Sequence, residues 1–234
     1  MMDRKQGISG ELKDLLYENG AALVGFADVS DMVKNDMVYG VSVAVTISPE
    51  IIQSIHNGPN MEYFNTYHAL NEKLDVLITK GAEFLNSNGY KAYAQTTKVT
   101  KQDEEFRTAL PHKSFATKAG LGWIGKSALF VTKQFGSAIR LSSLVTNAEL
   151  SCGEPITTSI CGDCMLCTNA CPGNAISGKN WRADMDRSEL FNPYACEKKA
   201  REIANEKIDK IITLCGKCIE VCPYTQNYVK TYKK

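Results

Sequence analysis

Cysteine is absent from the first 151 residues of this chain of 234, whereas nine cysteines occur between Cys152 and Cys222. The chain also lacks an apolar run long enough to span a membrane, and its first thirty residues place acidic side chains between short apolar runs. We therefore expect neither a secretory leader nor a membrane span, but a cytoplasmic protein with reduced thiols. Clustered reduced cysteines are more typical of metal ligands than of disulfides.

An excess of charge of either sign is also missing, because 27 Lys and Arg residues offset 26 Asp and Glu residues to leave a formal net charge of +1. That balance supplies no overall electrostatic attraction for nucleic acid or an anionic membrane. The hydrophobic content of 44% predicts an ordinary globular protein. The length allows two units, one large and one small.

The first 150 residues alternate between helical and strand patterns. The spacing predicts a first helix capped by Ser9 that ends near Gly20, and a long amphipathic helix over residues 62–86. Strand-like runs occupy residues 22–26, 41–47, 90–95, 128–131 and 138–145. We therefore expect an α+β domain over residues 1–150.

Beyond residue 150 the chain is punctuated by cysteine, glycine and proline, interrupted by one charged helical stretch over residues 196–214. Four of these cysteines form the spacing C-x2-C-x2-C-x3-C-P, which ends at Cys171 and Pro172. Bacterial ferredoxins hold iron–sulfur clusters with this run, and in two-cluster proteins the fourth cysteine binds the other cluster. Residues 151–234 are therefore predicted to form a ferredoxin-like domain.

A second segment, Cys215, Cys218 and Cys222 before Pro223, repeats the last three positions of the first at the same spacing. Ile212 stands where its first cysteine would be. Cys196 is the natural replacement, because the intervening helix can return it to the site. We predict two [4Fe–4S] clusters, one on Cys161, Cys164, Cys167 and Cys222 and the other on Cys171, Cys196, Cys215 and Cys218.

Two other interpretations of the cysteines stay open at this point. One is structural zinc on four to six thiolates, and the other is a single cluster with spare cysteines. Pairs of the form C-x2-C also occur in zinc knuckles, although zinc sites do not ordinarily use three cysteines at two-residue spacing followed by a fourth and a proline. The ninth cysteine, Cys152, has no place in either predicted set.

Residues Gly120 to Gly125 satisfy the G-x-G-x-x-G pattern of dinucleotide-binding loops. That pattern needs a strand before its first glycine and a helix after its last. Here residues 114–120 are typical of a short helix with a glycine cap and residues 128–132 of a strand, so the order is reversed. We interpret the glycines as a loop whose backbone closely approaches a cofactor or another strand.

The glycine loop Lys118–Lys126, the segment Leu144–Asn147 and the two cysteine segments together resemble the epoxyqueuosine reductase family over roughly residues 60–225. Tyr67 and His68 also look like a Tyr-His pair of that family. The resemblance, which extends to the reductive dehalogenases, implies two [4Fe–4S] clusters beside a corrinoid such as cobalamin. It also implies that the corrinoid is held on an N-terminal α/β sandwich akin to flavin nitroreductases.

On this resemblance, the candidate cofactor-binding residues are Gly120, Gly122, Trp123, Gly125, Lys126, His68 and His112. Trp123 either stacks on a planar ligand or fills the core. His68 either packs within its helix or serves the cobalt or a proton transfer, and His112 follows Pro111 in a loop suited to a polar ligand. No catalytic residue is predicted.

Two departures from the family limit what carries over. Phe106 or a close neighbour stands where the family has an aspartate proposed as a proton donor, and the acidic residues 103–105 are out of register. The family also continues into a helical-repeat extension that helps hold tRNA, whereas this chain stops twelve residues after Cys222. Both departures argue against reduction of epoxyqueuosine in tRNA.

The leading hypothesis is an iron–sulfur oxidoreductase that passes electrons through two clusters to a corrinoid or similar cofactor and on to an organic substrate. The alternatives are a non-catalytic ferredoxin-type electron carrier and a reductive activator of a corrinoid on a partner protein. A pure carrier needs no α/β domain with its own glycine loop, which favours the reductase. The expected partners are a small-molecule cofactor and an electron donor such as a ferredoxin or flavodoxin.

Overall fold

The computed structural model describes residues 2–232, with side chains from residue 7 onward, and the chain divides into two compact units. Unit 1 comprises Met1–Val45, Leu70–Leu121 and Arg140–Ile156, and unit 2 comprises Thr46–Ala69, Gly122–Ile139 and Thr157–Lys234. Each unit therefore draws on three separate segments. The two contiguous domains predicted at 1–150 and 151–234 stay a prediction, because the units describe which segments pack together and not which pieces fold on their own.

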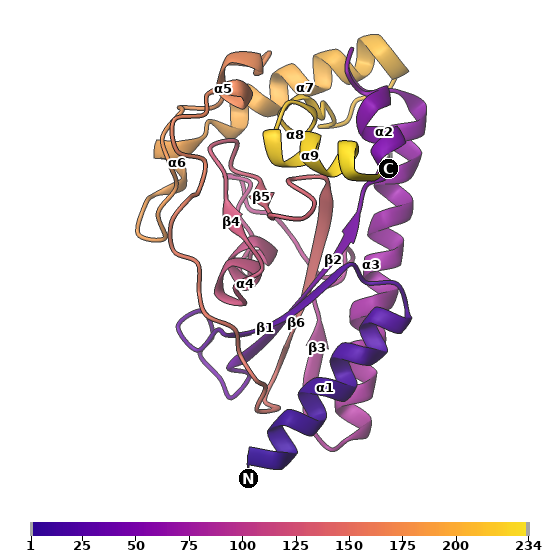
Figure 1. Ribbon diagram of the computed structural model, residues 1–234, viewed down its shortest axis with the longest axis vertical. Coiled ribbons are helices and arrows are strands. Elements are labelled where there is room, and N and C mark those ends of the chain that lie inside the picture. Colours follow the sequence, from indigo (N-terminus) through magenta and orange to yellow (C-terminus); the bar gives the residue numbers. More distant parts are fainter. Residues whose placement is uncertain (1, 233–234) are drawn as a thin grey trace. The chain divides into compact units, whose positions relative to one another are not determined.

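Unit 1 is built on a four-stranded sheet in the order β1-β2-β6-β3 (Figure 1). Its strands are β1 (Leu23–Asp28), β2 (Tyr39–Thr46), β6 (Ile139–Thr146) and β3 (Ala92–Ala94). β1 pairs antiparallel with β2, and β3 pairs antiparallel with β6. The β-branched runs that predicted strands at 22–26, 41–47 and 138–145 thus correspond to β1, β2 and β6.

Three helices pack on this sheet: α1 (Met2–Glu18), residues 70–87 of α3 (Met61–Ser87), and α4 (His112–Lys118). Leu12 of α1 and Ile78 of α3 share one apolar cluster with Leu144 of β6, and Phe115 of α4 shares another with Val145. Because neighbouring residues of a strand face opposite sides, the two clusters lie on opposite faces of the sheet. Unit 1 is accordingly a mixed α/β structure.

The predicted start of the first helix is wrong, since α1 begins at Met2 and Ser9 lies inside it. Ser9 is 3% exposed, and its hydroxyl accepts a hydrogen bond of 2.9 Å from the N–H of Ser151. A serine engaged in a tertiary hydrogen bond has the same local sequence signature as a cap. The predicted end is close, because the helix stops at Glu18 and Gly20 has φ +92°.

Unit 2 contains a short hairpin and a set of short helices. Its elements are α2 (Pro49–Ser54), residues 61–69 of α3, β4 (Trp123–Ile124), β5 (Phe130–Val131), α5 (Leu166–Ala170), α6 (Arg187–Leu190), α7 (Pro193–Ile208), α8 (Lys217–Glu220) and α9 (Pro223–Tyr232). α5 packs on α8, and α2 packs on both α8 and α9. Within residues 2–232 no helix combines the length and the apolar content needed to cross a membrane.

Helix α7 departs from the predicted range of 196–214 at both ends. It begins at Pro193 behind an Asn192 cap, and it ends at Ile208 because Asp209 adopts a left-handed conformation with φ 53°. Proline and asparagine at these positions are ordinary start signals, and a left-handed residue terminates a helix. Cys196 is consequently in the first turn of α7.

The Asn192 cap should contribute measurably to the stability of unit 2. Its Oδ1 accepts a hydrogen bond of 3.0 Å from the N–H of Ala195. Asn192→Ala should lower the free energy of unfolding by about 1 kcal/mol, whereas Asn192→Ser, which keeps a capping oxygen, should lose less. Denaturant unfolding followed by circular dichroism measures both. Equal losses in the two variants would contradict the capping role.

Candidate metal centre

The segment from Cys161 to Cys167 is a tight loop that leads into α5. Gly162 has φ +54°, a left-handed conformation that suits glycine, and the N–H of Cys164 donates to the carbonyl of Cys161 at 3.1 Å. The N–H of Cys161 donates to Ser159 Oγ at 3.2 Å. These local hydrogen bonds hold three thiols on one short stretch of chain.

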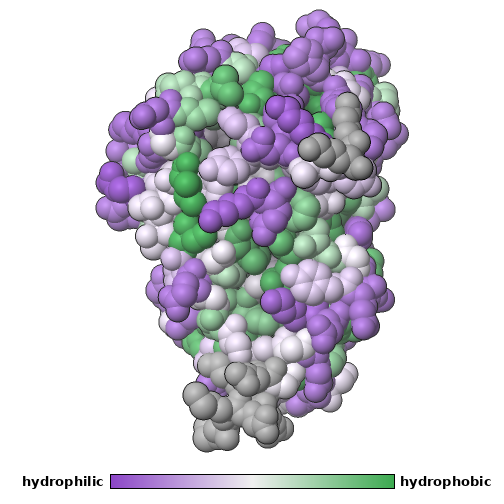
Figure 2. All heavy atoms as spheres, in the orientation of Figure 1, coloured by the Kyte–Doolittle hydropathy of each residue, from purple (hydrophilic) through white to green (hydrophobic). Residues whose placement is uncertain are grey.

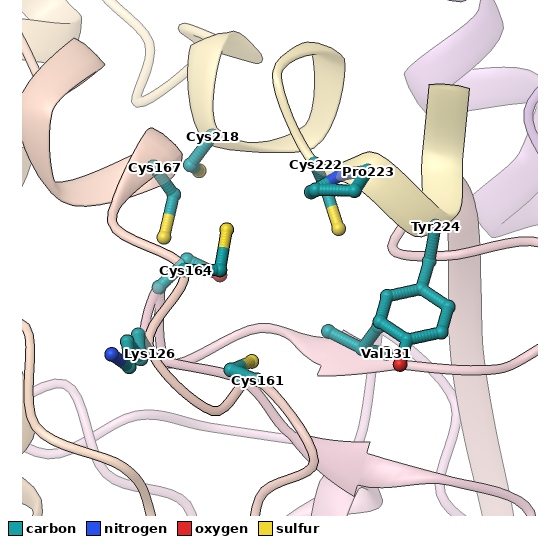
Figure 3. Close-up of a pocket in the computed structure, with 11 residues that line it drawn as sticks. Lys126, Val131, Cys161, Cys164, Cys167, Cys218, Cys222, Pro223 and Tyr224 are labelled. Carbon is teal, nitrogen blue, oxygen red and sulfur yellow. The ribbon is translucent and has the colours of Figure 1, made fainter. Parts of the chain in front are cut away.

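A hollow of about 430 Å³, part of it open solvent, lies beside this loop (Figure 3). Its sulfur lining consists of Cys161, Cys164, Cys167, Cys218 and Cys222. Burial, followed by the neighbouring thiolates of Cys161, Cys222 and Cys164, raises the pKa of Cys167. Cys222 follows α8, far along the chain from the loop, so the fold brings two separate cysteine segments to one hollow.

Four thiols form a second group of neighbours. Cys171 follows α5, Cys196 lies in α7, and Cys215 and Cys218 flank the start of α8. Burial and the thiolates of Cys171 and Cys215 raise the pKa of Cys196 to about 11. Burial and the thiolates of Cys215, Cys196, Cys167 and Cys171 raise the pKa of Cys218. Cys218 also lines the hollow of the first group, so the two groups adjoin.

The raised pKa values have a chemical consequence. Near neutral pH, burial, together with the charge of neighbouring thiolates, favours the neutral form of Cys167, Cys196, Cys215 and Cys218. A metal that binds them as thiolates must displace those protons, so binding strengthens as pH rises. In the part of the chain that the structure describes, no group of three His, Cys, Asp or Glu side chains is arranged to hold a single metal ion.

The glycine loop packs tightly on strand β5. A Cβ on Gly122 would lie 2.2 Å from the carbonyl oxygen of Val131, and a Cβ on Gly125 would lie 2.9 Å from Val131 Cγ2 and 3.5 Å from Cys161 Sγ. For these two glycines the close neighbour is therefore a strand and a cysteine of the hollow. The loop follows α4 and precedes β5, which is the reverse of the dinucleotide-binding order, as the sequence predicts.

The two large side chains of the loop are both buried in unit 2. Trp123 is 1% exposed, and its ring meets the edge of Tyr224 with centroids 5.0 Å apart, so it fills the core. Lys126 is 4% exposed and lines the hollow, where its Nζ donates to Met165 Sδ at 3.6 Å. Gly120 belongs to unit 1, where a Cβ would lie 2.6 Å from the carbonyl oxygen of Glu154.

The candidate histidines fall in different units. His112 of unit 1 begins α4, is largely buried, and its Nδ1 lies 2.7 Å from Ser143 Oγ. His68 of unit 2 is exposed on α3, where its ring contacts the rings of Phe64 and Tyr67. His112 is thus packed within unit 1, whereas His68 lies on the surface of unit 2.

The acidic segment near Phe106 is committed to its own loop. Asp103 Oδ1 accepts hydrogen bonds from the N–H groups of Glu105 (2.9 Å) and Arg107 (2.8 Å), and the Glu105 carboxylate pairs with the Arg107 guanidinium at 3.0 Å. Phe106 has φ 58°, which this turn imposes. Asp103 and Glu105 therefore stabilise their own loop, and neither is left free to take the role of the family's aspartate.

Sequence reasoning missed one polar cluster beside the second group of thiols. Glu220 is 8% exposed and accepts hydrogen bonds from His56 Nδ1 at 3.0 Å and from Lys217 Nζ at 2.9 Å. Lys217 Nζ also donates to the carbonyl of His56 at 3.1 Å. A charged residue between two cysteines of a metal motif was the available signal, but its partner His56 stands 164 residues away.

Known proteins share both the cysteine segment and a longer stretch of this chain. Residues 160–225 match the family described as 4Fe-4S double cluster binding domain. The epoxyqueuosine reductase of Lactococcus garvieae is 31% identical over 160 residues, which cover 68% of this chain and 42% of that protein. The enzyme of Cellulophaga algicola is 29% identical over 163 residues, which cover 68% and 48%.

This chain is a relative of the epoxyqueuosine reductases. The resemblance predicted from the glycine loop and the cysteine segments is thereby confirmed, and so is the presence of a 4Fe-4S cluster binding domain. The chain spans less than half the length of these two curated reductases.

Solved structures extend the likeness to the fold of nearly the whole chain. An epoxyqueuosine reductase with an epoxyqueuosine-modified tRNA-Tyr stem loop gives a TM-score of 0.63 at 18% identity, covering 95% of this chain and 66% of that one. A catabolic reductive dehalogenase in complex with 3-bromo-4-hydroxybenzoic acid gives 0.67 at 16% identity, covering 92% and 31%. This relative of the epoxyqueuosine reductases thus has the mixed α/β fold of both groups.

The buried His112 should make the stability of this protein sensitive to acid. Burial, followed by the Arg140 guanidinium and opposed by Asp75, lowers its pKa from 6.5 to about 4. The unfolded chain therefore binds the proton more tightly. The stability that His112 contributes is fully present above pH 6.5 and is lost as pH falls towards 4, a change of about 3 kcal/mol.

Thermal unfolding of the wild type and of His112→Gln between pH 4 and 7 tests this. The wild type should lose stability more steeply on acidification than His112→Gln, which cannot titrate there. His68→Gln, which removes an exposed histidine, should keep the wild-type slope. Identical slopes for all three proteins would show that His112 is not the acid-sensitive group.

Proposed function

We propose that this chain is an iron–sulfur oxidoreductase that binds two [4Fe–4S] clusters, with the eight ligands divided as the sequence predicts. The supporting observation is the division of the thiols into two sets of electrostatic neighbours. Burial is the largest cause of the raised pKa of both Cys167 and Cys196; the thiolates that add to it are those of Cys161, Cys222 and Cys164 for Cys167, and those of Cys171 and Cys215 for Cys196. Hereafter, Cys161, Cys164, Cys167 and Cys222 are the first set, and Cys171, Cys196, Cys215 and Cys218 are the second set.

The position of Cys196 supports its role as the replacement ligand. Its thiol is an electrostatic neighbour of Cys171 and Cys215, although nineteen residues separate it from Cys215 in the sequence. Helix α7 spans most of that interval and ends at Ile208, which leaves residues 209–214 to lead back to Cys215. This helix supports Cys196 as the ligand that takes the place of the cysteine missing at position 212.

The donor chemistry of the hollow fits an iron–sulfur cluster. Its metal-ligating groups are thiols alone, and Val131, Pro223 and Tyr224 add apolar and aromatic walls. Four thiolates in a largely apolar shell are the usual surroundings of such clusters, and the shell sets the reduction potential. Clusters of this type, when bound, exchange one electron at a time. Zinc accounts less well for eight thiols in two adjoining sets.

The finer description of the fold also belongs to this proposal. We assign unit 1 to the nitroreductase-like α/β sandwich and the cysteine-bearing part of unit 2 to a ferredoxin-like domain with two clusters. The likeness to solved epoxyqueuosine reductases and reductive dehalogenases supports both assignments. A low-potential one-electron donor such as a ferredoxin or flavodoxin is the partner that such an arrangement requires.

Cobalamin is the acceptor that we propose for the electrons, supported by a reductive dehalogenase of the same fold whose structure is described in terms of B12-dependent dehalogenation. The loop residues first assigned to this cofactor do not form a cradle for it within unit 2. Trp123 is buried against Tyr224, and Gly122 and Gly125 pack on β5. A corrinoid site in this chain would therefore be formed mainly by residues other than Gly122, Trp123 and Gly125.

The packing of Trp123 on Tyr224 and of the loop glycines on β5 favours a second candidate function. In that function the chain is a reductive activator or ferredoxin-type carrier that delivers electrons to a corrinoid on a partner protein. A loop that supports the cysteine hollow serves electron delivery without a resident corrinoid.

Epoxyqueuosine in tRNA is not the substrate that we propose. Two of the carboxylates near the position of the family's aspartate, Asp103 and Glu105, are engaged by their own loop.

Anaerobic reconstitution tests the two clusters. The wild type should take up about eight irons and about eight sulfides per chain, and Cys196→Ala should retain about four of each because only the second set loses a ligand. Iron and sulfide analysis together with EPR of the reduced protein measures this. Cys152→Ala, which removes the cysteine outside both sets, is the matched control and should keep the wild-type content.

Two results would overturn parts of this proposal. A wild type with about four irons would refute two full clusters. A Cys196→Ala variant that retains the wild-type iron content and both EPR signals would refute the replacement ligand.

Cobalamin binding separates the two candidate functions. A resident corrinoid predicts that cobalamin added anaerobically to the cluster-loaded protein elutes with it on gel filtration in equimolar amount. The activator predicts no co-elution, together with electron transfer from the reduced protein to a separate corrinoid protein. Failure to bind cobalamin in a protein that holds its full iron content would sink the resident-corrinoid hypothesis.

A further inference from the structure

A lysine ammonium is buried beside the first set of cysteines. Lys126 is 4% exposed and lines the same hollow as Cys161, Cys164, Cys167 and Cys222 (Figure 3). Within residues 2–232, its one polar contact is with the thioether sulfur of Met165, and no carboxylate pairs with it. A charge kept from water without a counter-ion is costly, so this position favours a negatively charged neighbour.

Met165 covers the ammonium without neutralising it. Its side chain is held against Gly178, where a Cβ would lie 2.6 Å from Met165 Cε. Gly178 has φ +84°, so glycine suits this position on both counts. A thioether is a weak, uncharged acceptor, and the full positive charge of Lys126 therefore remains available to the hollow.

The second set has a cation of a different kind. Lys217 is next to Cys218, but its Nζ lies 2.9 Å from the carboxylate of Glu220, which His56 also contacts at 3.0 Å. The Glu220 side chain is 11% exposed and receives both contacts, so it serves as the counter-ion of Lys217. Lys217 and Glu220 together carry almost no net charge.

Two acidic residues lie near the first set in sequence: Glu220, which precedes Cys222 by two residues and is paired with Lys217, and Asp163 between Cys161 and Cys164. The side chain of Asp163 is exposed, so water and salt screen its charge strongly. Figure 2 shows hydrophilic residues over much of one face, where side chains are open to water. Screening at such a surface is far stronger than at Lys126, which is shielded by protein.

We propose that Lys126 makes the centre on the first set the easier of the two to reduce. This inference rests on the proposed function with its two clusters. Reduction adds one electron to a centre and moves no atom, so the added negative charge is attracted by a nearby buried ammonium. The Lys217–Glu220 pair gives the second set no comparable stabilisation. Lys126 thus draws the electron of a singly reduced protein towards the first set, next to the glycine loop.

Potentiometric titration with dithionite, followed by EPR, tests the inference on the full chain. Cys161→Ala and Cys196→Ala each lose one set and supply reference signals for the other. In the wild type the first-set centre should be reduced before the second. Lys126→Met should then be measured at the potential where the first-set centre of the wild type is half reduced. At that potential, the ratio of reduced to oxidised first-set centre in the variant should be roughly tenfold lower than in the wild type.

Two variants control for the charge. Lys126→Arg keeps the positive charge and should titrate close to the wild type. Lys133→Met removes an exposed lysine of the same unit and should leave both centres unchanged, because its charge is screened. Equal shifts of both centres in Lys126→Met, or a shift of the same size in Lys126→Arg, would overturn the inference.

Iron content separates this inference from the proposed function. A wild type with about four irons refutes the two clusters, and the inference with them. A wild type with about eight irons whose first-set centre is not the easier to reduce refutes the inference alone. That wild-type comparison decides the matter even if Lys126→Met fails to assemble its clusters.

Discussion

The burial of cysteine thiols is the constraint on which unit 2 depends. The fold gathers eight thiols from three stretches of chain, and their burial raises the pKa of Cys167, Cys196, Cys215 and Cys218. Without metal these groups are neutral, weakly polar side chains with little to hold them together. Metal binding and the final packing of this unit are therefore expected to be coupled.

The supports of the first set come from outside the cysteine segments. Strand β5 presents the Val131 carbonyl so closely that only glycine fits at position 122, and Gly125 brings the loop against Cys161. Thr225 of α9 packs on Gly136, and its hydroxyl accepts a hydrogen bond from the N–H of Ser137 at 3.1 Å. The hairpin thus fixes the loop on one side and the helix that follows Cys222 on the other.

The second set has a different support. Helix α2, from an early segment of the chain, packs on α8, and His56 in the turn after α2 contacts Glu220. A Cβ on Gly216 would lie 2.6 Å from Ile55 Cδ1, so the turn before Cys218 is also pressed against this segment. Residues 46–69 therefore belong with the cysteines in unit 2, although their sequence carries no metal-binding pattern.

By itself the sequence determined what depends on short-range order. The two-residue cysteine spacing predicts the cluster binding domain, the strand and helix periods predict the mixed α/β fold, and the glycine loop indicates the family. The same local information misplaced the start of α1, because Ser9 uses its hydroxyl for Ser151, and the end of α7, because Asp209 turns left-handed.

Only the tertiary structure decided which charges and side chains stand beside the thiols. The burial of Lys126 under Met165, the pairing of His56 with Glu220 and the packing of Trp123 on Tyr224 all join residues that are distant in the chain. Burial and counter-ion pairing depend on distances through space, which a spacing pattern along the chain does not contain.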